Sequence, residues 1–121
     1  MKRVPFALAL FIASAGLAGA ETLDVLDAKV KNDPDNGSYG VMIYLSAPSG
    51  EIIERLTTGN VGRNMSIELN GKAVWLPVIT APITNRYFLL SNMNKDLAER
   101  LASDIGKAGS IGVTVMMPPG G

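Results

Sequence analysis

Apolar and polar residues alternate along several short stretches of the chain, and this period of two predicts β-strands. Strands are expected over residues 23–31, 40–46, 64–69, 72–79, 84–91 and 110–117. Asn36-Gly37 and Asn70-Gly71 each stand between two neighbouring stretches, which is typical of β-hairpin turns. Pro77 falls inside the fourth stretch and indicates an edge strand or a bulge, because proline has no N–H to give to a sheet.

Two further stretches repeat apolar residues every three to four positions, as amphipathic helices do. The first helix is expected to start near Pro48 and to end at Gly59. The second is expected to start at Asn92 or Asn94, which can cap it, and to run to about Ala108. The apolar stripes of the two helices contain Ile52, Ile53, Leu56, Leu97, Leu101 and Ile105.

The order of these elements is β-β-α-β-β-β-α-β. It predicts an α+β fold of ferredoxin-like type, with two helices packed on one face of a mostly antiparallel sheet. Ile52, Leu56, Leu97, Leu101 and Ile105 of the helices should then meet Val41, Ile43, Met65, Ile67 and Leu69 of the sheet. Residues 21–117 are expected to form this one domain, and residues 118–121, Pro-Pro-Gly-Gly, a flexible tail.

The first twenty residues have the order of a secretory signal peptide. Lys2 and Arg3 precede an apolar run, and Ala18-Gly19-Ala20 supplies an A-x-A cleavage site before Glu21. The apolar run is shorter than the roughly 20 residues that cross a membrane, so cleavage is favoured over an uncleaved anchor. The chain is therefore expected to be exported to the periplasm or beyond, without a stable membrane span.

Charge and composition exclude several classes of function. Cleavage would remove Lys2 and Arg3, leaving nine Lys and Arg against 11 Asp and Glu, a formal charge of −2. Such a balance is unfavourable for binding nucleic acid, which needs clustered basic residues. The chain has no cysteine and no histidine, so disulfides and a zinc or copper site built from these residues are excluded.

No constellation of catalytic residues stands out in the sequence. The absence of histidine removes the commonest general base, and the serines have simpler positions at strand ends or caps. The acidic loop from Asp33 resembles a calcium loop, but Gly37 stands at position five and Tyr44 at position twelve, which is the wrong register. We therefore expect no enzyme activity, no cofactor and no metal site.

The middle of the chain carries a family pattern. Leu56-Thr57, then Asn60 to Gly71, then Lys72 to Ile79 resemble the head subdomain of the first periplasmic domain of SecD, a subunit of the SecDF complex that assists protein export. That family tends to show the pattern "lT…n.Gr.lai.lDG.v..aP.i", followed by an "IsG" strand end and a helix with leucine-alanine pairs. Leu90-Ser91 and Leu97-Ala98 match these later elements, and the resemblance extends from about Tyr39 to Gly109.

The sequence departs from the family at several points. Asn70 replaces the aspartate of the turn, Asn92 replaces the glycine of "IsG", and Trp75-Leu76 replace small residues before the proline. The resemblance implies a non-enzymatic module that contacts a secreted or non-native polypeptide outside the membrane. The alternative is an accessory protein of the envelope that docks on one specific folded partner.

The sheet face opposite the helices is expected to carry the contact surface. Alternation places Met, Trp and Tyr side chains there, and such exposed apolar residues commonly mark an interaction site. The expected polypeptide-binding residues are Met42, Tyr44, Trp75, Tyr87 and Met116, and Ala73 is expected on the same face. The competing interpretation is that the N-terminal strand, the tail or a second copy of the chain, as in a homodimer, covers this face.

Overall fold

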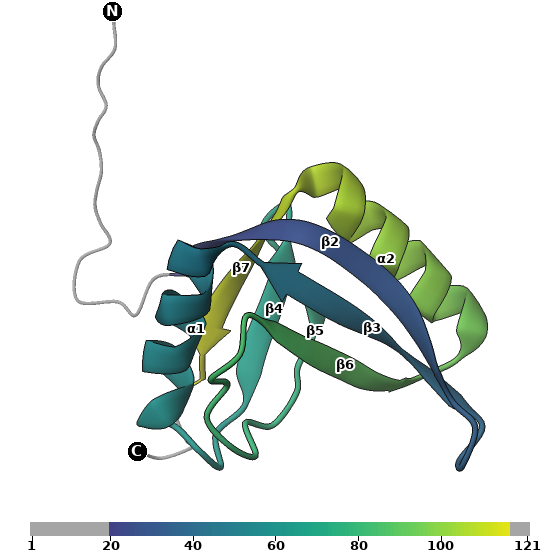
Figure 1. Cartoon of the computed structure of the whole chain (residues 1–121), viewed down its shortest axis with the longest axis horizontal. Coiled ribbons are helices and arrows are strands. Elements are labelled where there is room, and N and C mark those ends of the chain that lie inside the picture. Colours follow the sequence, from purple (N-terminus) through teal and green to yellow (C-terminus); the bar gives the residue numbers. More distant parts are fainter. Residues whose placement is uncertain (1–19, 117–121) are drawn as a thin grey trace, which may run out of the picture.

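The computed structural model describes residues 20–116, which form one six-stranded sheet and two helices (Figure 1). In chain order the elements are β2 (Glu21–Asp33), β3 (Ser38–Leu45), α1 (Ala47–Thr58), β4 (Met65–Leu69), β5 (Lys72–Trp75), β6 (Tyr87–Met93), α2 (Lys95–Ala108) and β7 (Ser110–Val115). The expected α+β fold and its element order are confirmed. The expected signal sequence and tail fall on residues 1–20 and 118–121, and apart from Ala20 they lie outside the described residues.

The sheet has the strand order β5-β4-β7-β2-β3-β6, and every pairing in it is antiparallel. The long strand β2 belongs to both halves of the sheet. Its first residues, Glu21 to Asp24, pair with β7, and the rest, from Val25, pairs with β3. A bulge between Val25 and Asp27 separates the two halves, and β2 arches over the molecule in Figure 1. As a result β5 and β6 are the two edges of the sheet.

Local sequence explains where the helices begin and end. The Ser46 side chain caps α1 by accepting from the Ser49 N–H, and Asn94 caps α2 by accepting from the Leu97 N–H at 2.8 Å. The helix α2 ends at Gly109, whose φ of 73° is a conformation that glycine adopts without strain. Of the two expected caps, Asn92 and Asn94, the structure has Asn94, and the expected end at Ala108 is confirmed.

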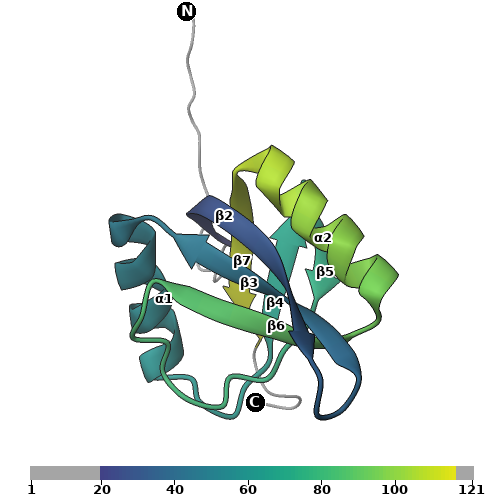
Figure 2. The same ribbon diagram turned by 45° about the vertical axis from the view of Figure 1, so that its right-hand side comes forward.

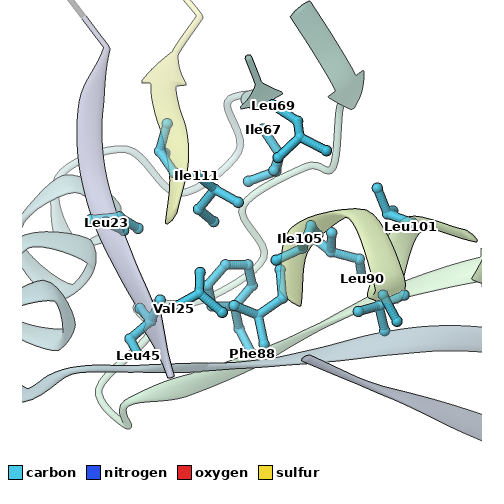
Figure 3. Packing of buried hydrophobic residues seen from close by; sticks show 14 of the residues in the cluster. Leu23, Val25, Leu45, Ile67, Leu69, Phe88, Leu90, Leu101, Ile105 and Ile111 are labelled. Atoms are coloured by element: carbon cyan, nitrogen blue, oxygen red, sulfur yellow. The ribbon is translucent and has the colours of Figure 1, made fainter. Parts of the chain in front are cut away.

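One core joins the two helices to the inner face of the sheet, the face that they cover. Figure 3 shows Leu101 and Ile105 of α2 beside Phe88 and Leu90 of β6. Ile53 is a fully buried apolar residue of α1, whereas Ile52 and Leu56 are half-buried. The remaining buried sheet residues include Leu23, Val41, Ile43, Met65, Ile67, Leu69, Ile111 and Val113.

Two strands, β5 and β6, differ from their predicted ranges by three residues or more at one end. The strand β5 stops at Trp75 instead of residue 79, because Pro77 has no N–H for the ladder. An isolated bridge between Asn64 and Val78 nevertheless keeps this segment beside β4. The strand β6 begins at Tyr87 instead of residue 84 and continues to Met93. Of the two expectations for Pro77, an edge or a bulge, the edge is confirmed, since β5 is an edge strand. The bulge in β5 lies before Pro77, between Ala73 and Trp75, opposite Glu68 and Ile67.

Candidate functional site

A groove with a volume of about 610 Å³ lies between the two edges of the sheet. One bank is the end of β5 and the segment that follows it, and the other bank is β6. Figure 2 shows where β5 and β6 lie in the fold. We call it the edge groove. Its lining residues are Trp75, Leu76, Pro77, Val78, Thr80, Leu89, Ser91 and Asn92.

The first bank presents the main chain of Val78 to the groove. On its other side this segment is tied to the residues that lead into β4. The Met65 N–H donates to the Pro77 carbonyl, and the Ile79 N–H donates to the Arg63 carbonyl, both at 2.8 Å. Main-chain groups of successive residues in a strand point to opposite sides. Since Pro77 and Ile79 bond toward β4, the N–H and C=O of Val78 point away from it.

The second bank presents the main chain of Tyr87 and Leu89. The Leu45 N–H donates to the Arg86 carbonyl at 2.7 Å, which sets the alternation along β6. Tyr44 pairs with Tyr87 and Met42 with Leu89, and these pairs are the ones that do not exchange main-chain hydrogen bonds. The main-chain groups of Tyr87 and Leu89 therefore point to the open edge of the sheet.

The strand β6 is interrupted near its end by a bulge. Its register with β3 shifts between Val41, which pairs with Leu90, and Tyr39, which pairs with Met93. Asn92 lies in this shift with a φ of 67°, in the left-handed region. A bulge of this kind bends an edge strand and stops regular pairing.

The floor of the edge groove leads into the core. A smaller hollow of about 170 Å³ shares Pro77, Val78, Thr80 and Leu89 with the groove. It is further lined by Met65, Ile79, Ala81, Ile83, Phe88 and Leu90. None of the residues that line the groove or the hollow carries a charge. The site therefore offers an apolar surface and main-chain hydrogen-bonding groups, and no ionic contact.

Three of the predicted contact residues lie together on the outer face of the sheet, next to the edge groove. Met42 and Tyr44 of β3 pair with Leu89 and Tyr87 of β6. The rings of Tyr44 and Tyr87 have centroids 5.9 Å apart, and the Lys29 Nζ lies 5.8 Å from the Tyr44 ring centroid. Tyr87 and Leu89 are each nearly half exposed. Sequence reasoning did not include Leu89, although it stands two positions after Tyr87 in an alternating strand.

The other predicted residues are placed elsewhere. Trp75 pairs with the buried Ile67, so it lies on the inner face and not on the expected outer face. The reason is the bulge in β5, which leaves Ala73 on the outer face opposite Glu68 and shifts the following residues to the inner side. Met116 follows β7 in the other half of the sheet, where its N–H donates to the Asn64 carbonyl. The structure thus places Met42, Tyr44 and Tyr87 on the outer face of β3 and β6 and Trp75 on the inner face, whereas Ala73 and Met116 lie in the other half of the sheet.

Two of the polar residues that are buried within residues 20–116, Ser49 and Thr57, have structural partners. The Ser49 Oγ accepts from the Asp24 N–H at 2.7 Å. The Thr57 Oγ1 donates to the Ile53 carbonyl and accepts from the Ile83 N–H at 2.9 Å. Residues 20–116 contain no group of three or more His, Cys, Asp or Glu side chains that could hold a metal ion, and no helix among them is long and apolar enough to cross a membrane.

Comparison with known proteins gave one consistent result. A family model described as "SecDF, P1 head subdomain" matches residues 13–113. The protein translocase subunit SecD of Thermobaculum terrenum is 31% identical over 90 residues, which are 74% of this chain and 17% of that protein. The chain thus spans about a sixth of the length of this relative.

Two solved structures share the fold. The first, described as "Structure and function of a membrane component SecDF that enhances protein export", has a TM-score of 0.59 and 23% identity and covers 78% of this chain and 44% of its own. The second, of SecDF in the Super-membrane-facing form, has a TM-score of 0.54 and 22% identity and covers 78% of this chain and 13% of its own.

Proposed function

The chain belongs to the SecDF P1 head subdomain family, and from this premise we propose that it is an exported, non-enzymatic module that binds secreted or non-native polypeptides. It works outside the cytoplasmic membrane after cleavage near Ala20, in support of protein export. The relatives' names connect them with protein translocation and export.

The observation that supports this proposal most is the uncharged edge groove, which is lined by both apolar and polar groups. An unfolded polypeptide exposes apolar side chains and unpaired main-chain groups, and the groove has complementary surfaces for both. The Met and Tyr side chains beside it add adaptable contact area. We propose that Trp75 and Leu89 contact the polypeptide in the groove and that Met42, Tyr44 and Tyr87 extend the contact surface along the outer face.

Site-specific crosslinking in the envelope tests the proposal. A photo-reactive amino acid at position 89 of the exported chain should capture many different secreted proteins. The same group at Arg100, on the exposed side of α2, serves as the control and should capture few. Capture of a single folded protein from position 89 would instead favour the accessory that docks on one partner. Equal capture from both positions would contradict a binding site in the groove.

A second measurement uses purified exported chain and an unfolded secreted protein. Leu89→Ala and Trp75→Ala should weaken capture, because both remove apolar contact area from the groove. Leu26→Ala is the matched control, since Leu26 is 72% exposed at the β2 bulge, away from the groove lining. Thermal unfolding of each variant shows whether a loss of capture arises from loss of the fold. Undiminished capture by both groove variants would contradict the proposal.

A further inference from the structure

We infer that the bound polypeptide enters the edge groove as an extended strand and pairs with β6 through main-chain hydrogen bonds. This inference rests on the proposed function and specifies how the same site recognises its partner. The partner is an uncharged, extended segment of another polypeptide chain.

The main-chain groups on the two banks support this mode of binding. Leu89 presents its N–H and C=O groups to the groove from one side, and Val78 presents its own from the other. Tyr87 presents its N–H and C=O groups along the same open edge of β6. Within residues 20–116, no strand or helix pairs with this edge of β6. Rows of strand-like donors and acceptors are complementary to one ligand above others, the main chain of an extended polypeptide.

The bulge limits the length of the pairing. Beyond Ser91 the left-handed Asn92 turns the main chain out of the regular alternation. The regular edge therefore runs from Tyr87 to Ser91, and a bound strand finds partners over this short span. Because few hydrogen bonds form over this span, binding is expected to be weak and reversible. Because main-chain hydrogen bonds do not depend on the side chains, many different sequences can form them.

The surroundings of the edge select the side chains of the bound segment. Side chains of a strand point alternately to opposite faces. In a strand paired with β6, one set would point into the 170 Å³ hollow beside Phe88 and Leu90, and the other set would lie on the outer face beside Tyr87 and Leu89. The hollow favours apolar side chains, and no charged residue in either lining could compensate a buried charge.

Backbone-modified peptides test the pairing directly. The probe is a short, end-capped, fluorescent peptide in which valine alternates with threonine, and fluorescence anisotropy measures its affinity for the exported chain. One derivative is N-methylated at every valine and another at every threonine. In an extended peptide alternate residues direct their N–H groups to opposite edges, so each derivative loses the N–H donors of one edge of the peptide. We expect at least one derivative to bind at least about tenfold more weakly than the parent peptide, since it loses several hydrogen bonds.

The outcomes separate this inference from the proposed function. Equal binding of the parent peptide and both derivatives would overturn strand pairing and leave polypeptide binding intact. Failure to bind the parent peptide, together with failure to capture an unfolded secreted protein, would overturn both. Capture of the unfolded protein without binding of the parent peptide would overturn strand pairing alone.

A change in the protein complements the change in the peptide. Leu89→Pro removes an N–H that faces the groove and leaves the ladder to β3 intact, as edge strands permit. Leu89→Ala is the control that removes the same side chain and keeps the N–H. We expect the proline variant to bind the parent peptide several-fold more weakly than the alanine variant. If the exported chain instead forms dimers that only Leu89→Pro dissociates, and both variants bind the peptide equally, the occupant of this edge is a second copy and the inference fails.

Discussion

Among single residues, Asn92 stands out because its main chain adopts a left-handed conformation that glycine adopts most easily. Its φ of 67° lies in the left-handed region, where glycine is free of strain and asparagine is tolerated better than most residues. The family pattern has glycine at this position. The substitution to asparagine therefore preserves the conformation that the β6 bulge requires.

Asn92→Ala should lower the free energy of unfolding by about 1–2 kcal/mol, because alanine lacks the side chain that eases the left-handed conformation. Asn92→Gly should leave it unchanged or raise it. Unfolding in urea measures both, and Ser91→Ala, the neighbouring position, should change the stability by less than about 0.5 kcal/mol. If Asn92→Ala is as stable as the parent protein, residue 92 does not need a side chain that eases the left-handed conformation, and this expectation is wrong.

Thr57 is the residue that ties α1 to the segment before β6. Its buried hydroxyl accepts from the Ile83 N–H at 2.9 Å and donates to the Ile53 carbonyl. Thr57→Val keeps the shape and removes both bonds, so unfolding should become easier by about 1–3 kcal/mol. Thr58→Val is the matched control, because the Thr58 hydroxyl is exposed and bonds only within the helix. Similar losses in the two variants in urea unfolding would contradict this role of Thr57.

At the scale of the elements, the sequence predicted the order and type of every strand and helix that the structure describes. Alternation, the two Asn-Gly turns and the helix caps act within a few residues, so they can be read locally. Asn70 and Gly71, for example, both adopt positive φ, as a two-residue hairpin turn of this type requires.

The bulges in β2 and β5 could not be predicted from the same pattern. A bulge shifts the alternation by one residue, so that Val25 and Ala28, three positions apart, both contact the core. In β5 the same effect moves Trp75 to the inner face. The groove depends on which strands form the two edges of the sheet, and strand order is a property of long-range packing that local alternation does not contain. Sequence reasoning therefore found Tyr87 and Trp75 but not the groove that lies between their strands.

The helix α2 supplies a large share of the core, and Leu101 lies near the middle of its buried stripe with 5% of its surface exposed. Leu101→Ala should lower the free energy of unfolding by roughly 2–5 kcal/mol, because it leaves a cavity against the sheet. Ser103→Ala, on the exposed side of the same helix, should have an effect within about 0.5 kcal/mol. Urea unfolding checks both, and a loss below about 1 kcal/mol for Leu101→Ala would show that the site repacks.

At the scale of the whole molecule, the charge distribution predicts a binding site that is insensitive to pH and salt. The chain has no histidine, and ordinary carboxyl groups titrate below about pH 5. Lys95 has its pKa raised above the ordinary value of 10.5 by a hydrogen bond from its ammonium group to Glu99, 3.0 Å away. A raised lysine pKa contributes stability that is lost only as the pH rises through that high value.

The affinity for an uncharged peptide should therefore stay constant between about pH 5.5 and pH 7, and between about 50 and about 500 mM salt. Fluorescence anisotropy titrations under these conditions measure it. A peptide with added lysines provides the comparison, since the acidic exported chain should bind it more weakly as salt rises. A strong salt dependence for the uncharged peptide would show that charges outside the groove contribute to binding.

The expected boundary between the signal peptide and the domain is a second property of the whole chain. Glu21, the first residue of β2, pairs with Val113, so the expected cleavage after Ala20 would fall directly before the sheet. The exported protein should begin Glu-Thr-Leu, which N-terminal sequencing or intact mass determines. Ala18→Lys should block processing, whereas Ala18→Ser, which keeps a small residue, should not. A full-length protein retained in the membrane without this change would contradict the expectation.

The central place of β7 in the sheet has a consequence for the proposed export of this protein. The last described strand, β7 (Ser110–Val115), lies between β4 and β2 and connects the β4–β5 pair to the rest of the sheet. A chain that crosses a membrane with its N-terminus first cannot connect the β4–β5 pair to β2 until β7 has also crossed. During that interval β4 and the first residues of β2 lack the strand that pairs with them both. If the chain is exported as proposed, a protein that binds unfolded polypeptides is itself incompletely folded until its own transport is almost complete.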